Sequence, residues 1–181
     1  MKTSRLSLLA AGALVAMVGG CHSSARPAPP TVALALDRSG LDSVVGRQWD
    51  GDASPIPRGR PQSAWLIDFR NDSSPVFGVS IHVARGRRLL TFARVVRQSR
   101  QLPVWVTLDA AWLPPLRRGF RIASRCRYER TVDEQVLALV RYTDTAWFTE
   151  VRAAWRANPG TGRIEVAEIR GLSCENEGWG G

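Results

Sequence analysis

Large apolar residues recur at every second position along much of the chain after residue 63, and this period of two constrains the fold most strongly. Trp65, Ile67 and Phe69 fall on one side of the segment 64–70, and 77–83 repeats the pattern with Phe77, Val79, Ile81 and Val83. Such alternation is typical of half-buried strands. The polar residues 71–75 between the two segments suit a turn, so we expect a hairpin.

Six further segments have strand patterns. They lie at about 88–97, 103–109, 120–129, 136–142, 151–157 and 163–169. The segment 120–129 alternates throughout, and 136–142 is almost continuously apolar, as expected of a central strand. The residues 158–162 are typical of a hairpin turn.

Short connections between these segments favour antiparallel neighbours, because parallel strands need long crossovers. We therefore expect an all-β fold, an antiparallel meander of roughly eight strands that forms a small barrel or a sandwich. One or two short helices are compatible with the pattern. The candidates are a helical turn at 37–45 and residues 145–151, where helical and strand spacing both fit.

The N-terminus has the layout of an export signal. Lys2 and Arg5 precede the uncharged run 6–20, which ends at Cys21. A charged start, an apolar stretch and small residues before the cut define a secretory signal peptide. A signal that ends in Val18-Gly19-Gly20-Cys21 resembles the lipobox of bacterial lipoproteins. The alternatives are an ordinary secretory signal and a transmembrane anchor, for which the apolar run is short.

The resemblance to lipoproteins covers residues 1–21 and implies cleavage before Cys21, whose sulfur would carry a diacylglyceryl group. Two or more acyl chains hold a protein stably on a membrane. His22, in place of an aspartate after the lipidated cysteine, implies an outer-membrane lipoprotein that faces the periplasm. We therefore divide the chain into a signal peptide (1–20), a lipidated cysteine with a proline-rich tether (21–33) and one β domain (34–181).

Two other cysteines, Cys126 and Cys174, stand 48 positions apart. In an exported domain two thiols are expected to form a disulfide, because that compartment is oxidising. The alternative is a reactive thiolate at Cys126, whose pKa the neighbouring Arg125 and Arg127 would lower.

Positive charge is concentrated in the middle of the chain. The net charge is +9, and residues 85–130 contain 12 arginines against Asp109 and Glu129. Outside the cytoplasm we do not expect nucleic acid as the partner, whereas envelope proteins and anionic polymers are available. The alternative is that these arginines pair with the acidic C-terminal part of the same fold.

A partner-binding surface is predicted on the polar side of the segment 120–129. Its basic residues are Arg121, Arg125 and Arg127. Trp179 in the C-terminal tail could add an aromatic anchor, or it could cover the core.

Catalytic motifs are absent from the sequence. The chain has two histidines, His22 and His82. Either could act as a base only beside a nucleophile, and the sequence contains no Gly-x-Ser-x-Gly nucleophile motif. The acidic segment 50–54 lacks most ligands of a calcium loop. A glycosidase needs only two suitably spaced carboxylates, and the basic middle of the chain offers few candidates, Asp109 and Glu129.

We therefore predict a non-catalytic lipoprotein without a cofactor or a metal. Its expected role is to bind an envelope protein or polymer, for example as an inhibitor or immunity protein. A structural envelope lipoprotein and a carrier of an apolar ligand are the alternatives, and a hydrolase of envelope polymers is the third possibility.

Overall fold

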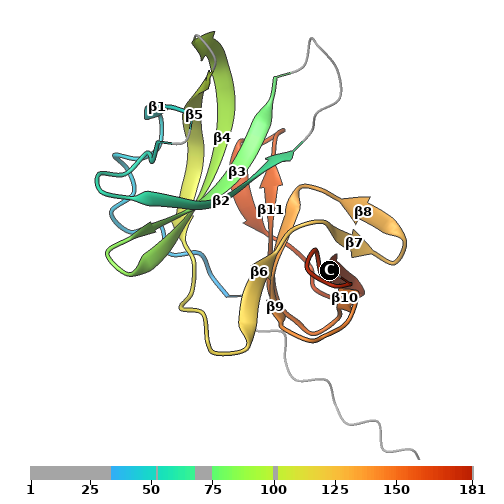
Figure 1. The fold of residues 1–181 in the computed structure, drawn as a ribbon. Coiled ribbons are helices and arrows are strands. Elements are labelled where there is room, and N and C mark those ends of the chain that lie inside the picture. The colour runs from blue at the N-terminus through green and yellow to red at the C-terminus, as the bar shows by residue number, and fades with distance from the viewer. Residues whose placement is uncertain (1–33, 52, 68–74, 100–101, 181) are drawn as a thin grey trace, which may run out of the picture. The chain divides into compact units, whose positions relative to one another are not determined.

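The described part of the chain folds into thirteen strands, arranged in three antiparallel sheets (Figure 1). The computed structural model describes residues 34–51, 53–67, 75–99 and 102–180, and these contain no helix. The predicted antiparallel all-β fold is confirmed. The predicted signal peptide and tether, and with them Cys21 and His22, lie outside the described residues.

Each sheet is named here with its strands in spatial order. Sheet A contains β1 (Gln48–Asp50), β5 (Leu102–Trp112), β4 (Arg87–Ser99), β3 (Phe77–Ala84) and β2 (Arg60–Ile67). Sheet B contains β12 (Arg163–Val166), β11 (Val151–Asn158), β9 (Val136–Arg141) and β6 (Phe120–Ala123). Sheet C contains β10 (Trp147–Phe148), β13 (Leu172–Glu175), β7 (Cys126–Tyr128) and β8 (Thr131–Asp133).

Sheet B is buried on both faces, because alternate residues of its strands belong to two different cores. Leu137 and Leu139 of β9 pack with Phe77 and Phe92 of sheet A. The intervening residues of β9, with Val140 among them, pack in the other core with residues of sheet C. This double burial explains the continuous apolar run of β9 and confirms it as a central strand.

The face of sheet A that points away from sheet B, called the outer face below, is partly covered. Leu41 and Val44 from the turns before β1 pack there against Leu89 and Ala110. These turns replace the helical turn expected at 37–45. Backbone hydrogen bonds from the amides of Leu41 and Val44 to carbonyls three residues earlier form the turns.

The predicted hairpins are present, and the alternation of apolar residues correctly predicted most of the longer strands. β2 pairs with β3 and β11 with β12. The first predicted strand begins earlier, at Arg60, and its residue Phe69 lies outside the described residues. The last one ends at Val166 and not at Ile169.

The prediction of one continuous strand over 120–129 is wrong. β6 ends at Ala123 and β7 begins at Cys126, and Arg125 between them has a φ of 52°. This left-handed conformation breaks the alternation. The chain passes here from sheet B to sheet C, so a segment with uninterrupted strand periodicity serves two layers.

The prediction of roughly eight strands was too low because four strands are too short to show a period. They are β1, β8, β10 and β13, with two to four residues each. β10 and the start of β11 also replace the short helix considered for residues 145–151. β1 and β2 are the two edges of sheet A, and within the described ranges no sheet closes on itself. The sandwich alternative is therefore the one that agrees with the structure.

Candidate functional site

A pocket on the outer face of sheet A begins with small residues in the middle of the sheet. Gly78 of β3 lies beside Ala93 of β4 in register. A Cβ atom added to Gly78 would lie 2.9 Å from Cη2 of Trp105. The glycine therefore makes room for the Trp105 indole, which reaches from β5 across β4 to β3.

Trp49 forms the same wall of the pocket as Trp105. The two residues are register partners in β1 and β5, so their side chains share one face of the sheet. Their rings stack with centroids 5.9 Å apart and an interplanar angle of 20°. The Trp49 Nε1–H donates a hydrogen bond to Oγ1 of Thr107 at 3.2 Å, which fixes the indole on the sheet.

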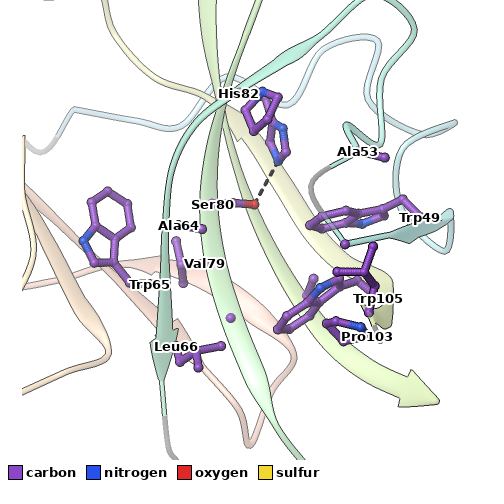
Figure 2. A pocket seen from close by; sticks show the side chains of 15 residues that line it. Trp49, Ala53, Ala64, Trp65, Leu66, Val79, Ser80, His82, Pro103 and Trp105 are labelled. Atoms are coloured by element: carbon purple, nitrogen blue, oxygen red, sulfur yellow. Dashed lines mark hydrogen bonds between the residues drawn. The ribbon is translucent and has the colours of Figure 1, made fainter. Parts of the chain in front are cut away.

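The opposite wall comes from β2. Figure 2 shows Ala64 and Leu66 on one side of β3 and the two tryptophans on the other. The cavity between them has a volume of about 190 Å³. Leu66 and Leu102 line it and are 52% and 50% exposed, so its rim presents apolar surface to solvent.

The polar groups of the pocket are His82 and Ser80. His82 is fully buried, and its ring lies at an angle of 89° to the Trp49 ring, with the two centroids 5.6 Å apart. Its Nε2 lies 2.8 Å from Oγ of Ser80, and that oxygen lies 2.8 Å from Oγ1 of Thr91 (Figure 2 shows the first bond). Burial disfavours the charged imidazolium and lowers the pKa of His82 to about 4, so the ring is neutral at neutral pH.

In the described residues Nδ1 of His82 has no hydrogen-bond partner, so no third side chain orients the ring as in a Ser–His–Asp triad. The Ser80 hydroxyl is also shared with Thr91.

The two carboxylates considered for a glycosidase lie in different sheets. Asp109 belongs to β5 in sheet A and is 4% exposed, and Glu129 follows β7 in sheet C. The Asp109 carboxylate accepts hydrogen bonds from Arg38 and from two backbone amides. The Asp109 carboxylate is therefore engaged in hydrogen bonds within the fold.

Metal binding finds no support in the described ranges, where no cluster of three or more potential ligands occurs. Asp52 of the acidic segment 50–54 lies outside those ranges. Nor does any segment described here form a helix with the length and apolar character needed to cross a membrane.

Comparisons with known proteins add no assignment to this site. No protein-family model, curated protein or solved structure matches the chain.

The predicted disulfide is present. Cys126 and Cys174 are register partners in β7 and β13, and their sulfur atoms are bonded. Both residues are fully buried in the core between sheets B and C. The reactive-thiolate alternative for Cys126 is therefore wrong in this structure.

The three predicted partner-binding arginines do not lie along one strand face. Arg121 of β6 is the register partner of the buried Val140, and its guanidinium carbon lies 5.6 Å from the centroid of Phe148. It lies at the edge of the core between sheets B and C.

Arg125 and Arg127 make their contacts with β10 and β13 of sheet C. Nε of Arg125 lies 2.9 Å from Oε2 of Glu175, and the Arg127 guanidinium carbon lies 3.4 Å from the Trp147 ring centroid. Arg125 therefore forms an ion pair with the acidic C-terminal part of the chain, as the alternative explanation of the basic middle expects. Trp179 is 55% exposed, as an anchor would be. The role of all four residues in partner binding stays a prediction.

Sequence reasoning missed the pocket, although a signal was present. The outward positions of 77–83 are Gly78, Ser80 and His82, which are unusually small or weakly polar for a solvated face. Trp105 occupies the outward side of the segment 103–109. These residues could be recognised in the sequence. That they form an apolar wall above small residues could be predicted only if the register between the strands were known.

Proposed function

We propose that this protein is a lipid-anchored, non-catalytic binding module of the bacterial envelope that captures one ring-sized apolar group in the tryptophan pocket. The observation that carries the proposal is the cavity between Trp105 and β2. Large aromatic side chains stand there on the outer face of a sheet whose inner face already has a full core. Exposed apolar concavities of this kind mark binding sites.

The size of the cavity limits its occupant. Its volume is about 190 Å³, whereas an engineered cavity of about 150 Å³ binds benzene and drug-sized ligands need roughly 300 Å³ or more. One aromatic ring or a short branched chain would fill the pocket, and an extended acyl chain would not. The ring could belong to a free small molecule or to a side chain of an envelope protein.

The location is proposed from the N-terminal sequence. A lipid on Cys21 and the tether 21–33 would hold the β domain at the outer membrane, facing the periplasm. The disulfide Cys126–Cys174 supports export, because such bonds persist in oxidising compartments.

The test is a titration of the full chain in lipid nanodiscs with toluene, with empty discs as the reference. The chain has seven tryptophans, and incorporation of 5-fluorotryptophan gives each one its own ¹⁹F resonance. We expect toluene to shift the signals of Trp49 and Trp105 and to leave that of Trp179 unchanged. If the two pocket signals do not move at saturation, the proposal is wrong.

Two rim variants make the test specific. Leu66→Asp and Leu102→Asp place a charge at exposed positions of the rim, so the fold should tolerate them while toluene affinity falls by about tenfold or more. Val166→Asp is the matched control, because Val166 is 52% exposed and lies on β12 outside the pocket. Equal losses in all three variants would contradict a site at the rim.

The source of the ring is decided by a second probe. A peptide with one phenylalanine among glycine and serine residues presents the ring as a partner protein would. Binding at least as tight as that of toluene assigns the pocket to a partner's side chain. Binding of toluene alone assigns it to a free small molecule.

A further inference from the structure

Strand β2 is a long open edge of sheet A beside the tryptophan pocket. It has eight residues and, within the described ranges, pairs only with β3. The other five strands at sheet edges have two to four residues each. An edge strand presents backbone N–H and C=O groups with which another chain can pair, and proteins often keep such edges short. Among the described strands, β2 is therefore the edge best suited to accept an added strand.

The hydrogen bonds of β4 show which backbone groups of β3 point towards β2. Successive residues of an antiparallel strand turn their N–H and C=O groups to opposite sides. The Arg88 carbonyl accepts a hydrogen bond from the amide of Leu113, which directly follows β5, so Arg88 faces β5. Thr91, three positions later, therefore faces β3 and bonds with its register partner Ser80. Ser80 thus faces β4, and the next residue, Val79, faces β2.

The backbone groups at the open side of β2 belong to residues that line the pocket. Val79 bonds with its register partner Trp65, so Trp65 faces β3. Ala64 and Leu66 flank Trp65, and their N–H and C=O groups consequently point to the open side. Both residues are exposed, and both line the pocket. Side chains of directly opposite residues share one face of a sheet, so a strand added here would place side chains at the pocket.

Trp105 shows that a ring can reach the pocket from a strand two positions away. Its indole starts on β5, crosses β4 and lies beside Gly78 of β3. Neighbouring strands are about 4.8 Å apart, so a strand added to β2 would lie equally far from β3 on the opposite side. Ala64 lies between that strand and the pocket, and its small side chain would let an aromatic ring pass.

The charges at the start of β2 favour one direction of the added strand. Arg58 and Arg60 are exposed there, and neither takes part in an ion pair among the described residues. In an antiparallel addition the carboxyl-terminal part of the new strand lies beside the start of β2. Arg60 precedes Ala64 by four positions, so an acidic residue at a similar distance after the ring would lie near these arginines.

We propose that the ring captured in the tryptophan pocket belongs to an extended segment of a partner protein, which adds to β2 as an antiparallel strand with its aromatic residue opposite Ala64. This inference rests on the proposed function, because it names the partner that delivers the ring. In strand addition the backbone hydrogen bonds provide affinity and the side-chain pockets provide specificity. The segment recognised here has an aromatic residue followed by an acidic one.

The first experiment uses a short threonine-rich peptide with a central phenylalanine and a glutamate near its carboxyl end. One derivative is methylated at the amide nitrogen of the phenylalanine, and the control derivative at that of the next residue. The phenylalanine N–H would donate to β2, whereas the next N–H would point away from it. Affinities for the full chain in nanodiscs are read from the ¹⁹F signal of Trp105. The first methyl group should weaken binding by about tenfold and the second by less than about twofold.

The direction of the strand has its own control peptide, in which the glutamate stands near the amino end. At low salt this peptide should bind about threefold more weakly than the original, because its charge lies away from Arg58 and Arg60. Equal affinity of the two peptides would overturn the antiparallel direction.

Hydrogen exchange of the wild-type protein tests the strand addition directly. The amides of Ala64 and Leu66 should become protected when the peptide binds and should stay unprotected with toluene. The Trp65 amide, which bonds with β3, should keep the same protection in both cases.

The outcomes separate the two proposals. If neither toluene nor the peptide moves the Trp105 signal, the proposed function is wrong and this inference fails with it. If toluene binds, but the two methyl groups have equal effects and Ala64 and Leu66 gain no protection, the pocket stands and the strand addition alone is overturned.

Discussion

Asp109 on β5 accepts a hydrogen bond from the backbone N–H of Ile164 on β12, with 2.8 Å between Oδ2 and the nitrogen. This bond joins sheet A to sheet B. Arg38 strengthens the junction, because its Nη2 lies 3.0 Å from the same carboxylate oxygen and donates at 2.7 Å to the Ile164 carbonyl. The carboxylate that looked like a catalytic candidate in the sequence thus holds two layers of the fold together.

Replacing Asp109 by alanine should destabilise the protein by about 3 kcal/mol, because Arg38 and two backbone amides lose a buried acceptor. Urea unfolding measures the change. Glu150→Ala is the control, since its ion pair with Arg141 is exposed and should contribute less than about 1 kcal/mol. Equal losses in both variants would contradict the structural role of Asp109.

Removing the disulfide with Cys126→Ala and Cys174→Ala should lower the free energy of unfolding by about 4 kcal/mol, the chain-entropy value for a loop of 48 residues. Denaturant curves with and without a reductant provide the measurement. The reductant should weaken the wild type and leave the double variant unchanged. A wild type insensitive to full reduction would argue against this stabilisation.

Gly78→Ala should displace the Trp105 indole, because the new methyl group would lie 2.9 Å from Cη2 and 3.0 Å from Cζ3 of that ring. Overpacking of this kind typically costs about 1–3 kcal/mol. We expect a shifted ¹⁹F resonance of Trp105 and weaker toluene binding. In the control Gly178→Ala the nearest atom to the new Cβ is 3.8 Å away, so neither quantity should change.

Stability should depend on pH through His82. Burial lowers its pKa from 6.5 to about 4 in the folded state, so the unfolded chain binds the proton first as the pH falls. The stabilisation of the folded state by the neutral His82 ring is complete above pH 6.5 and is lost as the pH falls towards 4. Between pH 7 and pH 5 the free energy of unfolding should fall by about 2 kcal/mol.

Comparison of that pH profile with the variant His82→Gln isolates the histidine. Asp37 and Glu165, whose pKa values hydrogen bonds lower, contribute at more acidic pH. The variant should be nearly flat between pH 7 and pH 5. A variant profile as steep as that of the wild type would assign the dependence to other groups.

Cys21→Ser should abolish lipid attachment. Cells that express the wild type and are fed radiolabelled palmitate should yield a labelled protein in the membrane fraction, and the variant should yield none. The measurement is autoradiography of the separated fractions. Equal labelling of both proteins would overturn the proposed anchor.

Local patterns in the sequence were sufficient for the long strands and for the disulfide. The alternation in β3, the apolar run of β9 and the turn between β11 and β12 each depend on a few consecutive residues. Cys126 and Cys174 are the two cysteines that follow Cys21, so their pairing could be predicted without any knowledge of geometry.

Contacts between distant segments decided the rest. β10 has two residues and acquires its identity from pairing with β13, and the break at Arg125 follows from the passage between two sheets. Neither the strand β10 nor the break at Arg125 produces a periodic pattern in the sequence. The number of layers was likewise unreadable, because apolar residues on both faces of β9 do not say what covers them.

The sequence by itself thus determined an antiparallel β fold with one disulfide, because period, turn chemistry and cysteine count are local properties. Only the tertiary structure decided that the Asp109 carboxylate joins sheets A and B by a hydrogen bond. It also decided that Trp49, Trp105 and His82 line one pocket. Trp49 and Trp105 are 56 positions apart in the chain. The register of β1 on β5 makes them neighbours on the outer face of sheet A, and the absence of a side chain at Gly78 leaves room there for the Trp105 ring.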